Sequence, residues 1–448
     1  MPTRQIRRRL GAGVVTIALL AAALTAVSPA RAAGQQVSLA APVPRAAAPF
    51  RSYDGTKPLE RIEPGTVLKT RTTTYSLDGI PVPLSVVQLL YRTVDQLGRP
   101  TVNVTSIIEP PVLGKPRRLV AYGSFYDSLD PADGPSYALA GGTSSGAAAV
   151  HAETALVTPF LLDGMAVLMT DTEGRTADFA AGPEYGKATL DAIRAAMSST
   201  RAELSSRVRI GLFGYSGGAI ATNWAAALAP RYAPELTKRL VGAAEGGVLV
   251  QPSHNLRYVQ GSQVWAGVLA MALVGASRAF EINLRRYLNP YGRKVFAELR
   301  SASISAVLGA YPGLTWKQLA KKRYGDPEQI PVYVRTVNKL NLGRAPIPTM
   351  PMFIGQGAGG VLEGTPGAGK GDGVMIAGDV RSLARRYCRH HNPHIRYRQY
   401  DATSHFTTVP LWLPDAVTWL GRRLAGAPAP GNCASIEKGS SLAPVPLP

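Results

Sequence analysis

Residues 207–229, RVRIGLFGYSGGAIATNWAAALA, carry the most informative pattern in this chain of 448 residues. Its first part places apolar residues alternately, at Val208, Ile210 and Leu212, which is the period of a β-strand. Its last part is an alanine-rich run typical of a helix. Between them lies Ser216, in a G-x-S-x-G pattern. A strand, a tight turn with a serine and then a helix form a nucleophile elbow, so Ser216 is the predicted nucleophile.

A second G-x-S-x-G pattern occurs at residues 142–146, with Ser144 at its centre. No comparable strand pattern precedes it, and the segment that follows reads as helical. A serine in this place is typical of a helix start, where its hydroxyl accepts a hydrogen bond from a backbone N–H. We therefore expect Ser144 to be structural.

The segments around the elbow alternate between strand and helix patterns. Three early strands are expected at residues 66–77, 84–94 and 101–109, and the turn-rich DQLGRP predicts a hairpin between the last two. Two further apolar runs and a helical stretch follow, at residues 117–127, 164–172 and 183–197. This alternation predicts an α/β fold with a mostly parallel sheet that is covered on both faces.

A nucleophilic serine needs a base, and in this fold the order along the chain is serine, acid, histidine. Of the six histidines, His405 fits best, because it lies just beyond a predicted strand at residues 395–400 and before the last helix. The others precede the serine, follow it too closely or cluster beside a helix end: His151, His254, His390, His391 and His394. His405 is therefore the predicted base.

The triad acid is expected in the long loop that follows a predicted strand at residues 347–357. Asp372 is the first candidate, because it stands between glycines just before the next helix. Asp379 is the second, since an acid at the start of that helix is also explained by the helix dipole alone. Glu363 is the third.

A glycine-rich part of the same loop imitates a phosphate-binding motif. GTPGAGKG, residues 364–371, contains G-x-x-x-x-G-K, but Gly371 stands where Ser or Thr would bind magnesium. We interpret this segment as a flexible insertion and expect no cofactor or metal. Nucleic acid is not an expected partner either, because the basic residues are spread along the chain.

The N-terminus has the pattern of a secretory signal peptide. A basic head precedes an apolar run at residues 14–27 and a small-residue cleavage motif that ends at Ala32. Residues 1–32 are the predicted leader and residues 33–64 an Ala/Pro-rich arm, so the mature protein is expected to be secreted. The leader carries five arginines of the net charge of +20, and the remaining +15 favours anionic lipid or cell-wall surfaces.

The chain has two cysteines, Cys388 and Cys433. An even number in an exported protein predicts one disulfide. A metal site would need further ligands at close spacing, which the sequence around these cysteines offers only in part.

A helical insertion is predicted at residues 250–345, where a minimal hydrolase needs only a short connection. It contains VWAGVLAMALVGA, residues 264–276, an apolar run too short to span a membrane. Two interpretations are open. The run is either a helix packed in the core or part of a cap whose inner face, with Leu269, forms an acyl-chain tunnel over Ser216.

Several separated motifs resemble one family. YGSFYDSLDPADGPSYAL, MTDTEGRTADFAAGPEYGKATLDAIRAA, GYSGGAIAT, GDGVMIAGDVRSLARRYC and SHF occur in the order found in the secretory lipases of the yeast lipase A type. The resemblance covers about residues 65–433. It implies that residues 65–448 form an α/β-hydrolase domain with a helical cap inserted at about residues 250–345. It also implies that the protein hydrolyses triacylglycerols or other carboxylic esters without a cofactor.

The same resemblance assigns roles to individual residues. Ser216, Asp372 and His405 match the nucleophile, the acid and the base. Asp127 and Gly217 match the residues whose backbone N–H groups form the oxyanion hole. The expected reaction is acyl transfer to the serine, followed by release of the acid by water.

Other functions remain open from the residues alone. A short-chain esterase, or an esterase of a polymer or the cell wall, would need the same triad, and so would a peptidase of this fold. A non-catalytic cell-surface binding protein would have little reason to keep serine, acid and histidine in this order.

Overall fold

The computed structural model describes most of the chain, namely residues 50–112, 114–365, 370–390 and 392–448. The predicted signal peptide, residues 1–32, lies outside the described residues, as do residues 33–49 of the predicted arm. The central part of the glycine-rich insertion, residues 366–369, also lies outside them.

The described end of the predicted arm packs against the sheet. The side chains of Tyr53 and Leu59 lie against a buried apolar cluster that contains Leu90. Arg51 forms an ion pair with buried Asp171 at 2.7 Å. This segment is therefore tied to the body of the fold.

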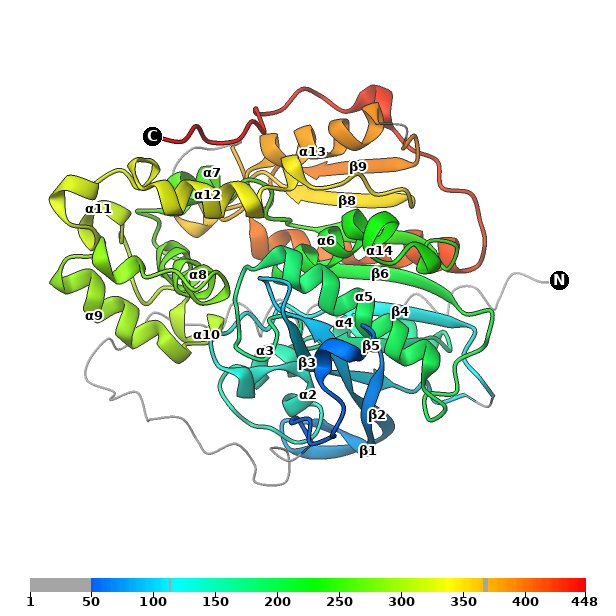
Figure 1. Cartoon of the computed structure of the whole chain (residues 1–448). Coiled ribbons are helices and arrows are strands. Elements are labelled where there is room, and N and C mark those ends of the chain that lie inside the picture. Colours follow the sequence, from blue (N-terminus) through cyan, green and yellow to red (C-terminus); the bar gives the residue numbers. More distant parts are fainter. Residues whose placement is uncertain (1–49, 113, 366–369, 391) are drawn as a thin grey trace.

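A nine-stranded sheet forms the centre of the molecule, in the order β1-β2-β3-β5-β4-β6-β7-β8-β9 (Figure 1). The strands are β1 Val67–Leu77, β2 Ile80–Val94, β3 Pro100–Ile108, β4 Arg118–Gly123, β5 Ala166–Thr170, β6 Arg209–Tyr215, β7 Leu240–Gly246, β8 Met352–Gly357 and β9 Ile395–Tyr400. The pairs from β5 to β9 are parallel, and β1, β2, β3 and β5 pair antiparallel. The predicted mostly parallel sheet is confirmed, and so is the β2–β3 hairpin.

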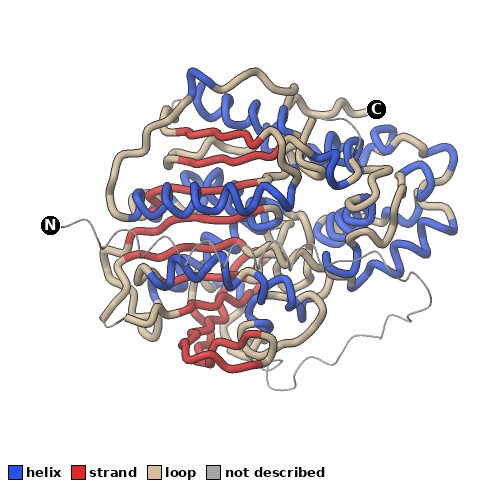
Figure 2. Tube along the Cα trace, turned by 180° about the vertical axis from the view of Figure 1, so that it is seen from behind, coloured by secondary structure: helices blue, strands red, loops and turns tan. Residues whose placement is uncertain are grey.

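Helices cover both faces of the sheet (Figure 2). On one face lie α5 Gly182–Ser198, α6 Gly217–Tyr232 and α13 Ala377–Arg389, and on the other α2 Pro135–Ala138, α3 Ala147–Ala152, α4 Thr154–Leu162 and α14 His405–Leu424. The strand period explains the two cores. In β6, Ile210 and Leu212 face the first, whereas Phe213 and Tyr215 face the second.

Between β7 and β8 the chain builds a separate group of helices, which we call the cap. It consists of α7 Pro252–Val259, α8 Ala266–Ala279, α9 Pro290–Glu298, α10 Ile304–Val307, α11 Trp316–Leu319 and α12 Pro331–Leu340. The cap has its own apolar core and lies at one end of the sheet (Figure 1). The apolar run predicted at residues 264–276 forms the largely buried α8. Among the described residues, no helix has the length and apolar character needed to cross a membrane.

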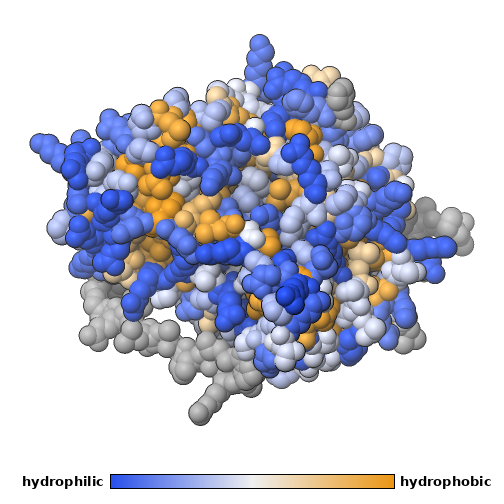
Figure 3. All heavy atoms as spheres, in the orientation of Figure 1, coloured by the Kyte–Doolittle hydropathy of each residue, from blue (hydrophilic) through white to orange (hydrophobic). Residues whose placement is uncertain are grey.

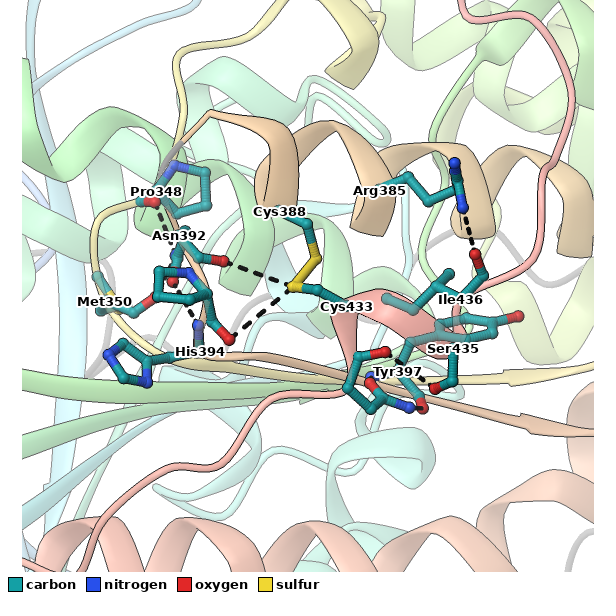
Figure 4. The surroundings of a disulfide bond; sticks show 12 residues. Pro348, Met350, Arg385, Cys388, Asn392, His394, Tyr397, Cys433, Ser435 and Ile436 are labelled. Carbon is teal, nitrogen blue, oxygen red and sulfur yellow. Dashed lines mark hydrogen bonds between the residues drawn. A yellow bond between two sulfur atoms is a disulfide. The ribbon is translucent and has the colours of Figure 1, made fainter.

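The predicted disulfide is present between Cys388 in α13 and Cys433 in the C-terminal segment (Figure 4). It closes a loop with a sequence separation of 45 residues. Beyond it, the C-terminal segment runs along α13 and reaches the cap, where Val445 exchanges two hydrogen bonds of 2.8 Å with the side chain of Asn338. The bond therefore anchors a segment that spans the body and the cap.

Removing this crosslink should lower stability without a direct effect on chemistry. For the C388S/C433S double variant we expect a free energy of unfolding lower by about 2–4 kcal/mol, because the unfolded chain regains loop entropy. Denaturant titration measures this. The wild type should lose the same amount when a reductant is added, while the double variant should not respond to it. An unchanged denaturation midpoint would contradict the prediction.

Candidate active site

Ser216 occupies the turn between β6 and α6 in a strained backbone conformation, with φ 54° and ψ −121°. Non-glycine residues rarely adopt such a φ, and they keep it only where the surrounding structure enforces it. Gly218 and Gly123 provide that packing, because a Cβ on either would overlap the backbone of the other. The structure thus contains the predicted elbow, which presents the serine hydroxyl at the carboxyl end of the central strand.

The three residues predicted to form a triad lie within hydrogen-bonding distance of one another. The Ser216 Oγ is 2.8 Å from Nε2 of His405, and Nδ1 of His405 is 2.8 Å from Oδ2 of Asp372. His405 begins α14, capped by Ser404, and its backbone N–H donates to the carbonyl of Asp372. An imidazole with its proton on Nδ1 donates to the acid and accepts from the serine, as acyl transfer requires.

The carboxylate of Asp372 is held from several sides. Its Oδ1 accepts hydrogen bonds from the backbone N–H groups of Val374 and Met375, at 3.0 and 2.7 Å. Its Oδ2 accepts from the side-chain amide of Gln356 at 2.9 Å, in addition to His405. These donors fix the direction in which the acid meets the imidazole.

Aromatic rings enclose His405. The ring of Tyr215 lies 5.0 Å from it on one side, and Trp265 of the cap meets it edge-on at 5.1 Å. Burial alone would lower the pKa of His405, but the charge and hydrogen bond of Asp372 outweigh this and raise the pKa above its usual value. The imidazole of His405 is therefore buried, oriented and made more basic.

The loop after β4 brings Asp127 into the site, with a positive φ of 31°. Its carboxyl oxygen lies so close to Gly217 that any Cβ at that position would overlap it. Burial raises the pKa of Asp127 to about 7, although the nearby His405 acts in the opposite direction. The resemblance had pointed only to the backbone N–H of this residue, and the structure adds its side chain to the site.

Two buried glutamates hold this loop. Glu153 accepts from the backbone N–H of Phe125 at 2.6 Å, and Glu173 accepts from that of Ser128 at 3.1 Å. Burial raises the pKa of both carboxyl groups well above the usual value. The backbone on either side of Asp127 is thereby fixed.

The alternative candidates have other partners. Ser144 accepts from the backbone N–H of Ala147 at the start of α3, at 3.2 Å, as expected for a structural serine. Asp379, in the first turn of α13, pairs with His254 of the cap at 2.9 Å. Neither joins the group around Ser216.

The remaining candidates are also accounted for. Glu363 lies close to His405 but accepts from the backbone N–H of Phe406 and from the indole of Trp265. His151 and His394 lie near backbone carbonyl groups elsewhere. His391 lies outside the described residues, and no contact places His390 near the site.

Sequence reasoning missed Tyr215, Gln356 and the two loop glutamates as parts of the site. The sequence contains signals for two of them, since Tyr215 is inside the G-x-S-x-G pattern and Gln356 is the last residue but one of the strand before the acid loop. Trp265 was inside the apolar run, but the pattern did not show that it reaches His405. Glu173 lies inside the motif that begins MTDTEG, and Glu153 lies outside the quoted motifs. Neither position showed a contact with this loop, because only the folded chain brings the two glutamates to it.

A cavity with about 1050 Å³ of space, part of it open to solvent, extends from Ser216 beneath the cap, and its lining is almost wholly apolar. One face of α8 forms a wall, with Val268, Leu269, Ala272, Leu273 and Ala276. The spacing of these residues is that of one side of a helix. Figure 3 shows apolar side chains gathered on the cap side of the molecule as well.

The described residues contain no group of three or more His, Cys, Asp or Glu side chains arranged to hold a metal ion. The chemistry that this site can perform with its own groups is nucleophilic acyl transfer, since serine, base, acid and a candidate oxyanion site meet at the mouth of an apolar cavity.

Comparisons with known proteins agree with this geometry. A family model described as secretory lipase matches residues 142–432. Lipase 5 of Candida albicans is 30% identical over 400 residues, covering 87% of this chain and 83% of the relative. A protein of Mycobacterium tuberculosis named "probable inactive lipase" is 29% identical over 371 residues, covering 82% of this chain and 79% of that protein. The crystal structure of Candida antarctica lipase A in its closed state has the same fold, with a TM-score of 0.74, 24% identity and coverage of 87% and 88%.

The two candidate acids should differ sharply on substitution. Asp372→Asn should lower kcat for ester hydrolysis by about 10⁴-fold, because the amide favours the wrong imidazole tautomer. Asp379→Asn should leave kcat nearly unchanged and weaken the start of α13 by about 1 kcal/mol. Steady-state kinetics and thermal melting of both variants check this. The reverse pattern would identify Asp379 as the acid.

Proposed function

The chain belongs to the secretory lipase family and is a carboxylic ester hydrolase, and we propose that it cleaves long-chain acyl esters such as triacylglycerols through a Ser216–His405–Asp372 triad. The observation that carries this proposal is the hydrogen-bonded series of Ser216, His405 and Asp372 at the mouth of an apolar cavity. Because one relative is named a probable inactive lipase, family membership alone does not supply the mechanism, and the site geometry is needed to support it.

In the first half of the reaction, the Ser216 Oγ attacks the ester carbonyl while Nε2 of His405 takes its proton. Asp372, 2.8 Å from Nδ1, stabilises the imidazolium that forms. His405 then gives the proton to the leaving alcohol, which leaves an acyl-enzyme. Water, activated by the same histidine, releases the carboxylic acid and restores the serine.

The oxyanion that forms in each half needs hydrogen-bond donors. The N–H of Gly217 lies at the N-terminus of α6, a position that favours negative charge. Asp127 lies next to it, and its raised pKa keeps its carboxyl group neutral in acidic and weakly acidic solution. A neutral carboxyl can donate a hydrogen bond to the oxyanion, whereas an ionised one repels it.

The apolar cavity supports the proposal that the acyl group of the natural substrate is long. A chain of methylene groups gains about 0.8 kcal/mol for each group moved out of water, and the apolar wall of α8 offers such burial. A short acyl group would leave most of this space empty. The same space is not needed by a peptidase or by an esterase of short side groups.

Secretion and surface attachment belong to the same proposal. The secretory lipase family, the leader pattern of residues 1–32 and the excess of basic residues support an exported enzyme that works near anionic lipid or cell-wall surfaces.

Chain-length preference tests the role of the cavity. Leu269→Asp should lower kcat/KM for palmitate esters by about tenfold or more, and much less for acetate esters, because a charge in the wall opposes burial of a long chain. Met271 is buried in the same helix and does not line the cavity, so Met271→Asp should lose stability and both activities together. An equal loss of kcat/KM on both esters in the Leu269 variant, with a lowered melting temperature, would falsify the proposal that this wall binds the acyl chain.

The pH dependence tests Asp127. In the wild type, kcat/KM should fall as the pH rises through about 7, because Asp127 ionises beside the oxyanion. Asp127→Asn keeps a donor and cannot ionise, so its activity should not decline over this range. Asp127→Ala should be weak at every pH. If the Asn variant keeps the same alkaline decline, Asp127 does not act in this way.

A further inference from the structure

A second buried carboxyl group lies beside the triad without a part in the steps above. Glu363 ends the short 3-10 helix η9 Gly360–Glu363, in the loop between β8 and Asp372, and is only 7% exposed. Its Oε1 accepts from the backbone N–H of Phe406 at 2.9 Å, and its Oε2 accepts from the indole N–H of Trp265. One carboxylate thus joins the acid loop, the first turn of α14 and the cap.

Trp265 is the cap residue that reaches the base. It lies just before α8, is 3% exposed, and its ring stacks on Phe406 at 5.0 Å while its edge meets His405 at 5.1 Å. The ring of Tyr215 also lies 5.0 Å from the imidazole. The indole N–H would be an unpaired buried donor without Glu363, so this hydrogen bond fixes the ring against His405.

Three carboxyl groups act on His405. Asp372 forms a hydrogen bond with its Nδ1, and the charges of Glu363 and Asp127 also raise the pKa of His405. The phenol of Tyr215 adds no charge, because burial raises its pKa well above the usual value. Burial also raises the pKa of Glu363, while the field of His405 and the donors at Phe406 and Trp265 favour its ionised form. A carboxylate at the N-terminus of α14 is also favoured by the helix dipole.

We propose that Glu363 is a positioning residue for ester hydrolysis, which fixes Trp265 and His405 relative to each other and stabilises the imidazolium formed in each step. This inference rests on the proposed function, in which His405 is the base. Glu363 acts through its neighbours, because its oxygens contact Trp265 and Phe406 and not Ser216.

The pH profile of kcat/KM on an acetate ester separates this role from a structural one. Glu363→Gln keeps the size of the side chain and removes its charge. At low pH, kcat/KM falls because His405 becomes protonated, and this acidic limb of the profile should move down by about one pH unit in the variant. Its kcat should fall by about tenfold, because an amide has one acceptor oxygen for the two donors at Trp265 and Phe406 and so holds the base less well. Trp265→Phe removes the N–H donor and part of the ring but leaves the charge of Glu363 in place. The pH at which its acidic decline begins should therefore stay near the wild-type value while kcat falls.

An unchanged acidic limb in a folded Glu363→Gln enzyme would overturn the inference. If that variant does not fold, Trp265→Phe decides, since an unchanged kcat and KM would overturn it equally. The proposed function fails separately, namely if the wild-type protein hydrolyses no ester or if its rate has no acidic limb.

Discussion

The strained backbone of Ser216 is the constraint on which the rest of the molecule depends. A serine at φ 54° is stable only because β6, α6 and β4 meet around it at glycines, and this requires a parallel sheet with its carboxyl edge open. The loop after β4 and the start of α14 lie at this same carboxyl edge of the sheet. They bring Asp127 and His405 to the serine from parts of the chain far apart in sequence.

The carboxyl groups of the site differ in their surroundings and are therefore suited to different roles. Asp372 accepts hydrogen bonds from Gln356, Val374, Met375 and His405, so it is suited to hold a cation opposite it. Asp127 is buried with far less support, and its pKa rises to about 7, which suits a neutral donor beside an oxyanion. Two acids that both act on His405 are thus suited to opposite charges in the proposed reaction. The cap completes the site by adding an apolar cavity and the ring of Trp265.

Local patterns in the sequence were sufficient for much of this architecture. The elbow, the β2–β3 hairpin and β9 were predictable because strand period and turn residues are properties of neighbouring positions. Order along the chain was sufficient to single out His405. It could rank Asp372 above Asp379 and Glu363 only weakly, because all three lie in or just after one irregular loop, and the path of that loop decides which carboxylate meets the imidazole. Local patterns could not predict the position of the Asp127 side chain. They could not predict the hydrogen bonds of Glu153 and Glu173 with its loop either, because these depend on contacts between distant segments.

The most direct test is covalent labelling of the proposed nucleophile, Ser216. A long-chain alkylphosphonate ester mimics the tetrahedral intermediate and bonds to an activated serine. After incubation with the purified protein, peptide mass mapping should find one modified serine, Ser216, and the rate of labelling should follow the loss of esterase activity. Modification of Ser144, or complete inactivation without modification of Ser216, would contradict the account.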